Sequence, residues 1–223
     1  MNYIGNACYH STADRLLALG EANWLAQMKS HFKNVSPYPL TDQQVRAWGN
    51  SYRALASALA SLPPEYEKLQ LIFEYVLPLL APGGEVREDE PIGVRADVIL
   101  LAEDTACVLE FKDRGEPYPG CERQARKYAN RLRRWHSGSI GMKKKTIVVL
   151  TQANELSEKR YRLALCSPDR LADSLCEIFP APLHEFPGTK MTAWMTSPWD
   201  ALRSKKRKKK KAPALKDEGG QPA

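Results

Sequence analysis

Two carboxylates and one amine near the middle of the chain have residue types that suit metal-ion chemistry. They are Asp97, Glu110 and Lys112. Two hard carboxylates with a neighbouring backbone carbonyl suit Mg²⁺ or Mn²⁺, which keep open coordination positions for water and a phosphate oxygen. A bound ion would also suppress the repulsion between the two carboxylates. The residue types therefore indicate a metal site, provided that the fold brings them together.

A predicted β-hairpin brings them together. Residues 96–101 and 106–111 are short apolar runs separated by a Glu-Asp-Thr turn, which predicts two antiparallel strands. If the hairpin is centred between positions 103 and 104, directly opposed residues have numbers with a constant sum, and Asp97 faces Glu110. Side chains alternate along a strand, so Lys112 lies on the same face as Glu110.

A charge network on a solvated face is the competing interpretation of the same three residues, because that is the common position of charged strand residues. Their neighbours argue against it. Residues 98–101 and 108–109 are apolar on both faces of their strands, as in central strands of a buried sheet. Charges at such positions need a functional reason.

The first 64 residues predict a helical N-terminal part of the same domain. Apolar residues recur at helical spacing between Leu16 and Met28. A second helix begins more clearly, because residues 41–44 fit a capping box and a long apolar stripe follows them. A third helix is predicted over about residues 65–77, between two proline-containing breaks.

The second half predicts an α/β architecture with a central mixed β-sheet flanked by helices. After the hairpin, residues 121–136 read as a helix and residues 146–150 as a buried strand, which makes a crossover to a parallel strand. A last helix is expected over about residues 168–179. We take residues 65–200 as the core and residues 201–223 as a disordered Lys-rich tail.

The order of these residues resembles the PD-(D/E)xK nuclease superfamily, which has a restriction-endonuclease-like core. Its motif places an Asp on one strand and Glu-x-Lys on the next, and this chain has Asp97 and then Glu110-Phe111-Lys112. Ala96 stands where the name-giving Pro would be. Glu74 is similar to the acidic residue that these nucleases often supply from the preceding helix, although position 85, 88, 89 or 90 is an alternative source.

A second motif extends the resemblance into the crossover helix. Gln124 and Tyr128 look like the Gln-x-x-x-Tyr motif of the RecB-like branch of the superfamily. Residues 73–136 are also similar to the nuclease-like module in front of some bacterial Schlafen-like helicases, but the remaining chain is too short for a helicase motor. In total the resemblance covers about half of the chain, from residue 74 to residue 150.

The resemblance implies a role for each site residue. Asp97, Glu110 and the carbonyl of Phe111 would bind the ion, and Glu74 would join them directly or through water. Lys112 would position the attacking water and help to deprotonate it, because nearby cations lower the pKa of that water. Gln124 and Tyr128 lie one helical turn apart and could both point at the substrate backbone, although ordinary helix packing is an equal alternative.

The predicted crossover helix is the most basic helix of the folded part, and it could line a phosphate track. A solvated helix face is the alternative, yet the imbalance exceeds what solubility requires. Trp135 suits the core better than base stacking, and a lone His136 is usually structural. The residues predicted to contact nucleic acid are Arg123, Arg126, Lys127, Arg131 and Arg134.

The net charge of +7 lies entirely in the tail. Residues 203–223 contain nine Lys or Arg and two acidic residues, so residues 1–202 are neutral in sum. Any nucleic-acid affinity of the folded part must then come from a local patch. Five cysteines without Cys-x-x-Cys spacing fit reduced thiols better than disulfides or a zinc site.

These patterns predict a metal-dependent nuclease that hydrolyses phosphodiester bonds of DNA, or less favourably RNA, with Mg²⁺ or Mn²⁺ as cofactor. The alternative is a catalytically silent module of the same fold that binds nucleic acid or scaffolds a partner. Nucleic acid is the expected partner, with a helicase or another protein as a further one. Because no long apolar run or secretory signal is seen, we expect no membrane contact and a cytoplasmic location.

Overall fold

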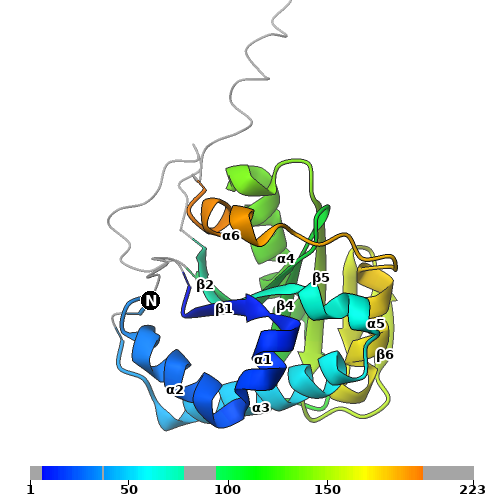
Figure 1. The fold of residues 1–223 in the computed structure, drawn as a ribbon. Helices are drawn as coiled ribbons and strands as arrows, with labels where there is room; N and C mark the ends of the chain where they lie inside the picture. Colours follow the sequence, from blue (N-terminus) through cyan, green and yellow to red (C-terminus); the bar gives the residue numbers. More distant parts are fainter. Residues whose placement is uncertain (1–6, 37, 78–93, 198–223) are drawn as a thin grey trace, which may run out of the picture.

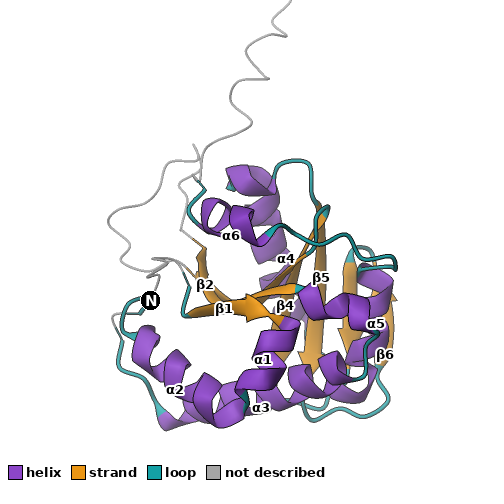
Figure 2. Cartoon of the chain, viewed as in Figure 1, coloured by secondary structure: helices purple, strands orange, loops and turns teal. Residues whose placement is uncertain are grey.

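The computed structural model describes residues 7–36, 38–77 and 94–197, which form an α/β fold around one seven-stranded mixed sheet (Figures 1 and 2). The strands are β1 (Tyr9–Thr12), β2 (Gln70–Leu77), β3 (Val94–Leu101), β4 (Thr105–Lys112), β5 (Lys143–Leu150), β6 (Ser157–Arg160) and β7 (Leu163–Cys166). The α-helices are α1 (Ala13–Leu19), α2 (Glu21–Phe32), α3 (Asp42–Ala60), α4 (Pro119–Trp135), α5 (Leu171–Ile178) and α6 (Gly188–Met195). This architecture confirms the predicted fold class.

The strand order is β1-β2-β3-β4-β5-β7-β6. Neighbours from β1 to β4 are antiparallel, β4 pairs with β5 and β5 with β7 in parallel, and β6 is antiparallel to β7. The hairpin register is the predicted one, since Val98 faces Leu109 and Leu101 faces Ala106. The crossover through α4 to a parallel β5 is confirmed as well.

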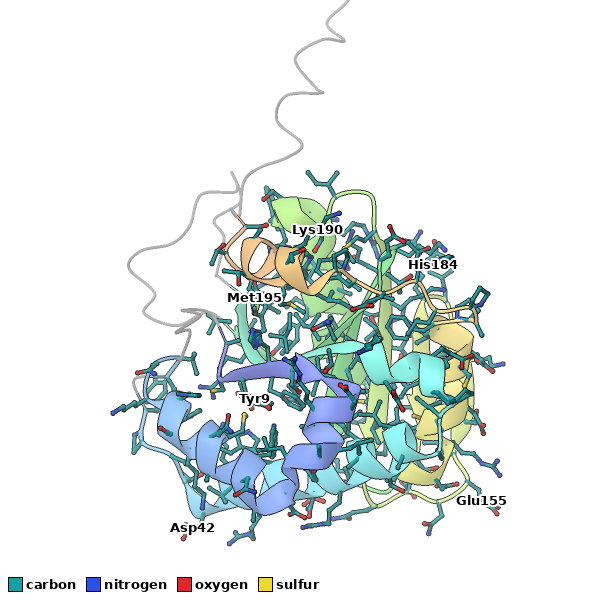
Figure 3. The ribbon with its side chains drawn as sticks, viewed as in Figure 1. Tyr9, Asp42, Glu155, His184, Lys190 and Met195 are labelled. Atoms are coloured by element: carbon teal, nitrogen blue, oxygen red, sulfur yellow. The ribbon has the colours of Figure 1, made fainter. Side chains whose placement is uncertain are left out.

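Helices cover both faces of the sheet. One face, here called the α3 face, packs against α1, α2, α3 and α5, whereas the other, the α4 face, packs against α4 and α6. Figure 3 shows Asp42, at the start of α3, at one end of the molecule and Lys190, on α6, at the other. None of the helices in the described ranges is long and apolar enough to cross a membrane.

The N-terminal helices agree with the sequence pattern in part. The Thr41 side chain accepts a hydrogen bond from the Gln44 N–H, so the N-cap of α3 is confirmed, but the reciprocal bond of a capping box, from the Gln44 side chain to the Thr41 N–H, is absent among the described residues. The preceding helical segment is divided at Gly20, whose φ of 76° interrupts the helix between α1 and α2. The part before residue 64 also supplies β1, which the sequence analysis did not predict.

The helix predicted over residues 65–77 is wrong. A 3₁₀ helix, Pro64–Lys68, is followed by strand β2, and all but one of the β2 residues are buried. A short apolar run looks alike in a buried strand and a buried helix, and here the aromatic and β-branched residues of the run favoured the strand. Glu74 therefore comes from a central strand rather than from a helix.

Helix α4 and strand β5 lie where the sequence predicts them, and α5 with the 3₁₀ turn Pro168–Arg170 occupies the predicted last helix. Strands β6 and β7 and helix α6 were missed. Strands β6 and β7 have four residues each, which is too short for a periodic signal, and α6 follows a proline-rich stretch, which is typical of irregular structure. All five cysteines are free, as expected. The predicted tail lies outside the described residues.

A buried polar network fastens α6 to the end of α4. His136 is fully buried, and its Nδ1 lies 2.7 Å from the Ser139 Oγ and its Nε2 3.3 Å from the Tyr75 hydroxyl. The same hydroxyl donates to the Met195 carbonyl at 3.0 Å. The Trp194 ring lies 4.4 Å from the imidazole, so His136 is a structural residue of this junction.

His136 should make the fold less stable as the pH falls. Burial lowers its pKa from 6.5 to about 4. Between these values the unfolded chain binds the proton and the folded chain does not, so the stabilisation is full above pH 6.5 and is lost as the pH falls towards 4. The expected loss is on the order of 3 kcal/mol. Urea unfolding of the parent and His136→Asn at several pH values should show a shallower loss in the variant. Identical pH slopes would contradict this role.

Candidate functional site

Strands β2 and β3 are interrupted at the same point, where Glu74 and Asp97 lie opposite each other. Phe73 pairs with Val98 and Tyr75 with Ala96, but no ladder pair joins the two carboxylate residues between them. Glu74 has a φ of 51°, which is unusual for a residue with a side chain.

The interruption changes the face of the sheet toward which the side chains of each strand point. On β2, Leu71 and Phe73 pack on the α3 face, whereas Tyr75 and Leu77 pack on the α4 face. On β3, Val98 packs on the α3 face although its second neighbour, Ala96, packs on the α4 face. Regular alternation would keep residues two apart on one face. Both strands therefore shift by one position at the carboxylates.

Two neighbours hold Glu74 in this conformation. The Trp48 indole donates to its Oε1 at 2.7 Å, and the Arg95 Nε lies 2.9 Å from its Oε2. A left-handed backbone at such a residue costs about 1–3 kcal/mol and persists only when the surroundings hold it. Strain of this kind gathers at functional sites, which favours a role for Glu74 beyond packing.

Asp97 and Glu110 are joined by reciprocal hydrogen bonds to backbone groups. The Asp97 N–H donates to the Glu110 Oε1 at 3.3 Å, and the Phe111 N–H donates to the Asp97 Oδ2 at 2.8 Å. These bonds continue the β3–β4 hairpin just past its last ladder pair. The structure thus brings together Asp97, Glu110 and Phe111, as the hairpin geometry predicts.

Lys112, Gln124 and Tyr128 complete the surroundings of Glu110. Its Oε2 accepts from the Lys112 Nζ and from the Gln124 amide, both at 3.1 Å. The same amide donates to the Tyr128 hydroxyl at 2.9 Å. Tyr128 is buried, as in the helix-packing alternative, while Gln124 is half-buried and supports Glu110.

Burial raises the pKa of all three carboxyl groups. The Glu74 pKa rises to about 7, first because of burial and then because of the Asp97 charge. The same two causes raise the Glu110 pKa well above its usual value, and burial raises that of Asp97. For Lys112, burial opposes the charge, but the Glu110 and Asp97 carboxylates outweigh it and raise the pKa. Lys112 is therefore a cation at neutral pH.

The charge balance of the site leaves room for a cation. Three carboxyl groups, from Glu74, Asp97 and Glu110, face two cations, Arg95 and Lys112, and the raised pKa values of the three groups show that two cations do not balance three negative charges here. Within the described ranges, however, no three His, Cys, Asp or Glu side chains are arranged to hold a metal ion. A metal here would rely on Asp97, Glu110, a backbone carbonyl such as that of Phe111, and water. Such a sparse set fits Mg²⁺, which keeps several waters. The alternative acidic residues at positions 85–90 lie outside the described residues.

The basic residues of α4 divide into two groups. Arg126 donates to the Tyr161 carbonyl at 2.6 Å and Arg131 to the Leu77 carbonyl at 3.2 Å, so both serve internal contacts. Arg123, Lys127 and Arg134 are exposed and recur at intervals of four and seven residues, which puts them on one stripe of the helix. Of the five predicted phosphate contacts, these three are the most exposed, although the Arg123 Nε also donates to the Pro119 carbonyl at 3.3 Å and Arg126 is partly exposed.

Replacing Gln124 should weaken Mg²⁺ binding more than it weakens the stability of the fold. The amide orients the Glu110 carboxylate, and removing such a partner of a metal ligand typically costs about 10- to 100-fold in metal affinity or activity. Gln124→Ala should raise the Mg²⁺ concentration for half-maximal thermal stabilisation of the protein by about that factor, and Tyr128→Phe should raise it less. Asn130→Ala, an exposed change on the same helix, is the control. An unchanged Mg²⁺ concentration for half-maximal stabilisation in Gln124→Ala would contradict this positioning role.

Sequence reasoning missed two residues of the site, Trp48 and Arg95. Trp48 lies in the apolar stripe that follows residues 41–44, and it does pack in the core, where its ring contacts Phe32. Its indole N–H nevertheless reaches Glu74. A buried Trp usually finds a partner for that N–H, which is the signal that would have marked it. Arg95 gave a weaker signal, as a lone cation two residues before Asp97.

Comparison with known proteins does not identify the chemistry of this site. No family model and no curated protein matches the chain. Among solved structures, that of protein VC1899 from Vibrio cholerae is similar over 72% of this chain, with a TM-score of 0.33 and 14% identity. The match covers 47% of that protein, so the chain spans about half of its length.

Proposed function

We propose that the chain is a metal-dependent nuclease of the PD-(D/E)xK type, with a restriction-endonuclease-like core. The observation that carries the proposal is the pair Asp97 and Glu110, whose carboxylates bind each other's strand and lie beside the Lys112 ammonium. Together they give the Asp, Glu-x-Lys arrangement that the sequence motif implies. DNA is the proposed substrate, ahead of RNA.

Each residue has a task in phosphodiester hydrolysis. Asp97 and Glu110 would hold Mg²⁺ or Mn²⁺ with the Phe111 carbonyl, and Glu74 would add negative charge directly or through water. The ion, when bound, supplies a Lewis acid that polarises the phosphate and lowers the pKa of a bound water. Lys112 would orient that water and stabilise charge on the phosphate as a permanent cation, in keeping with its raised pKa.

The substrate would approach over a surface that carries cations. Arg123, Lys127 and Arg134 project from α4, whose first half contributes Gln124 to the site. Contacts of this kind with phosphates position a nucleic acid without reading its sequence. A basic stripe next to a carboxylate site supports nucleic acid as the partner.

The proposal is tested by incubating the purified protein with linear, circular and single-stranded DNA, with Mg²⁺, Mn²⁺ or EDTA. Cleavage should require the metal and should disappear in Asp97→Asn purified in the same way, which excludes a contaminating nuclease. Metal-independent cleavage, or equal cleavage by the variant, would contradict the site assignment.

A catalytically silent nucleic-acid-binding module is the second candidate. It is favoured by the full burial of Glu110, which already has Lys112 and Gln124 as partners. Thermal unfolding separates the two candidates. Mg²⁺ should stabilise an enzyme, and Asp97→Ala should abolish that stabilisation, whereas a binding module should respond little to the metal.

A further inference from the structure

A pocket of about 190 Å³ opens beside Asp97 and Lys112 on the α3 face of the sheet. It lies between helices α2 and α3 on one side and strands β2, β3 and β4 on the other, and we call it the α3 pocket. Pockets for drug-sized ligands have volumes of about 300–1,000 Å³. The α3 pocket is therefore matched to a single ring system rather than to a whole nucleotide or a larger ligand.

The inner wall of the α3 pocket is aromatic. Trp24, Trp48 and Phe73 line it, and the Trp24 and Phe73 rings lie 5.1 Å apart. Trp24 is 1% exposed, yet its indole N–H has no hydrogen-bond partner within the part of the chain that the structure describes. An unpaired buried donor is unfavourable for the fold. Because that nitrogen has almost no accessible surface, Trp24 closes the inner end of the pocket and does not offer a donor to a ligand.

The outer wall of the α3 pocket is polar and comes from α3. Gln44, Asn50 and Ser51 line it there, next to Ala47. The Gln44 side-chain amide makes no hydrogen bond to any other described residue. A primary amide offers a donor and an acceptor side by side, which is the pattern that the edge of a nucleobase matches. Aromatic and amide groups thus meet in one small pocket at the reacting centre.

We propose that the α3 pocket binds one unpaired nucleobase of the strand whose phosphodiester lies at Asp97 and Lys112. The inference rests on the proposed function, because it takes nucleic acid as the ligand. A base that is paired and stacked in a duplex must leave the stack to enter such a pocket. The substrate class is therefore nucleic acid that is unpaired at the site of cleavage, such as a single strand or a frayed end.

Binding of a single-stranded oligonucleotide in EDTA tests the pocket without relying on cleavage. One abasic site is moved through the oligonucleotide, and the Kd of each version is measured. Loss of a bound base typically weakens binding by about 5- to 150-fold. A long oligonucleotide can bind in several registers, which would distribute the loss of affinity over several abasic positions. The oligonucleotide is therefore kept to about the site size of a single-strand-binding domain, roughly 4–16 nucleotides. We expect one position at which the abasic version binds more weakly by such a factor.

A pocket-filling variant identifies where the base binds. Ala47→Phe places a ring at the mouth of the α3 pocket, and Ser57→Phe, an exposed change farther along α3, is the matched control. Ala47→Phe should weaken binding of the intact oligonucleotide and leave the critical abasic version unchanged, while the control changes neither. Equal weakening of both versions, or equal Kd values for all abasic positions, would overturn the pocket proposal. Metal-dependent cleavage would then still support the nuclease, whereas the absence of all nucleic-acid binding would overturn both.

Discussion

Glu110→Gln is expected to abolish cleavage and, in the same protein, to stabilise the metal-free fold. The change removes a ligand charge, so several kcal/mol of transition-state stabilisation are lost, or on the order of 10³-fold or more in rate. The fold gains because the buried Glu110 carboxyl has a pKa raised well above its usual value by burial and by Asp97. A glutamine oxygen can still accept from Lys112 and Gln124, but its NH₂ group then faces the Asp97 N–H, which loses its acceptor and offsets part of the gain.

The sign of the stability effect follows from proton linkage. A carboxyl group whose folded pKa lies above its unfolded value stabilises the fold below the unfolded pKa and loses that contribution as the pH rises through the folded pKa. At pH 7.5 the metal-free parent therefore carries the ionisation cost of Glu110, Asp97 and Glu74, and Glu110→Gln should raise its unfolding free energy.

The matched control is Glu103→Gln, which makes the same chemical change at an exposed position in the turn of the same hairpin. It should alter neither cleavage nor the unfolding free energy by urea denaturation in EDTA. Mg²⁺ should stabilise the parent and the control but not Glu110→Gln. A destabilised or unfolded Glu110→Gln protein would instead favour a structural charge network at these residues.

The hairpin could be predicted from sequence because local rules determine it. Two apolar runs and a short acidic turn fix the register, and the register places Asp97 against Glu110. Helix α3 could also be predicted from sequence, because its N-cap and its apolar stripe are local signals. The parallel strand β5 followed from the spacing of a strand, a helix and a second strand.

The position of Glu74 could not be predicted in the same way. Strand β2 is buried on both faces, so its sequence lacks the alternation that distinguishes a strand from a helix. The reversal of faces at Glu74 depends on the Trp48 and Arg95 side chains, which come from distant positions. Contacts between residues far apart in the sequence produce no periodic pattern from which they could be predicted. The same holds for the α3 pocket, whose wall combines α2, α3 and three strands.

Deleting residues 203–223 is the second change with a large expected effect, and it should act on affinity rather than on chemistry. Residues 203–211 contain eight Lys or Arg and no apolar residue, and the deleted segment carries the entire net charge of +7. Each phosphate that a cation neutralises steepens the fall of affinity with salt, by about 0.7 per contact in log–log slope on a single strand and about 0.9 on duplex B-DNA. The truncated protein should therefore bind nucleic acid more weakly at low salt and show a flatter salt dependence.

The cleavage rate at saturating substrate separates this electrostatic role from a catalytic one. Because Asp97, Glu110 and Lys112 lie in the sheet, the truncated protein should keep its rate once the substrate concentration compensates for the weaker binding. A variant with residues 205–211 changed to Ser or Gln keeps the chain length and controls for deletion itself. It should reproduce the weaker, flatter binding of the truncated protein. If the affinity is unchanged across a salt titration from about 50 to 200 mM, a range over which phosphate contacts dominate binding, the tail does not hold the substrate and serves solubility or targeting instead.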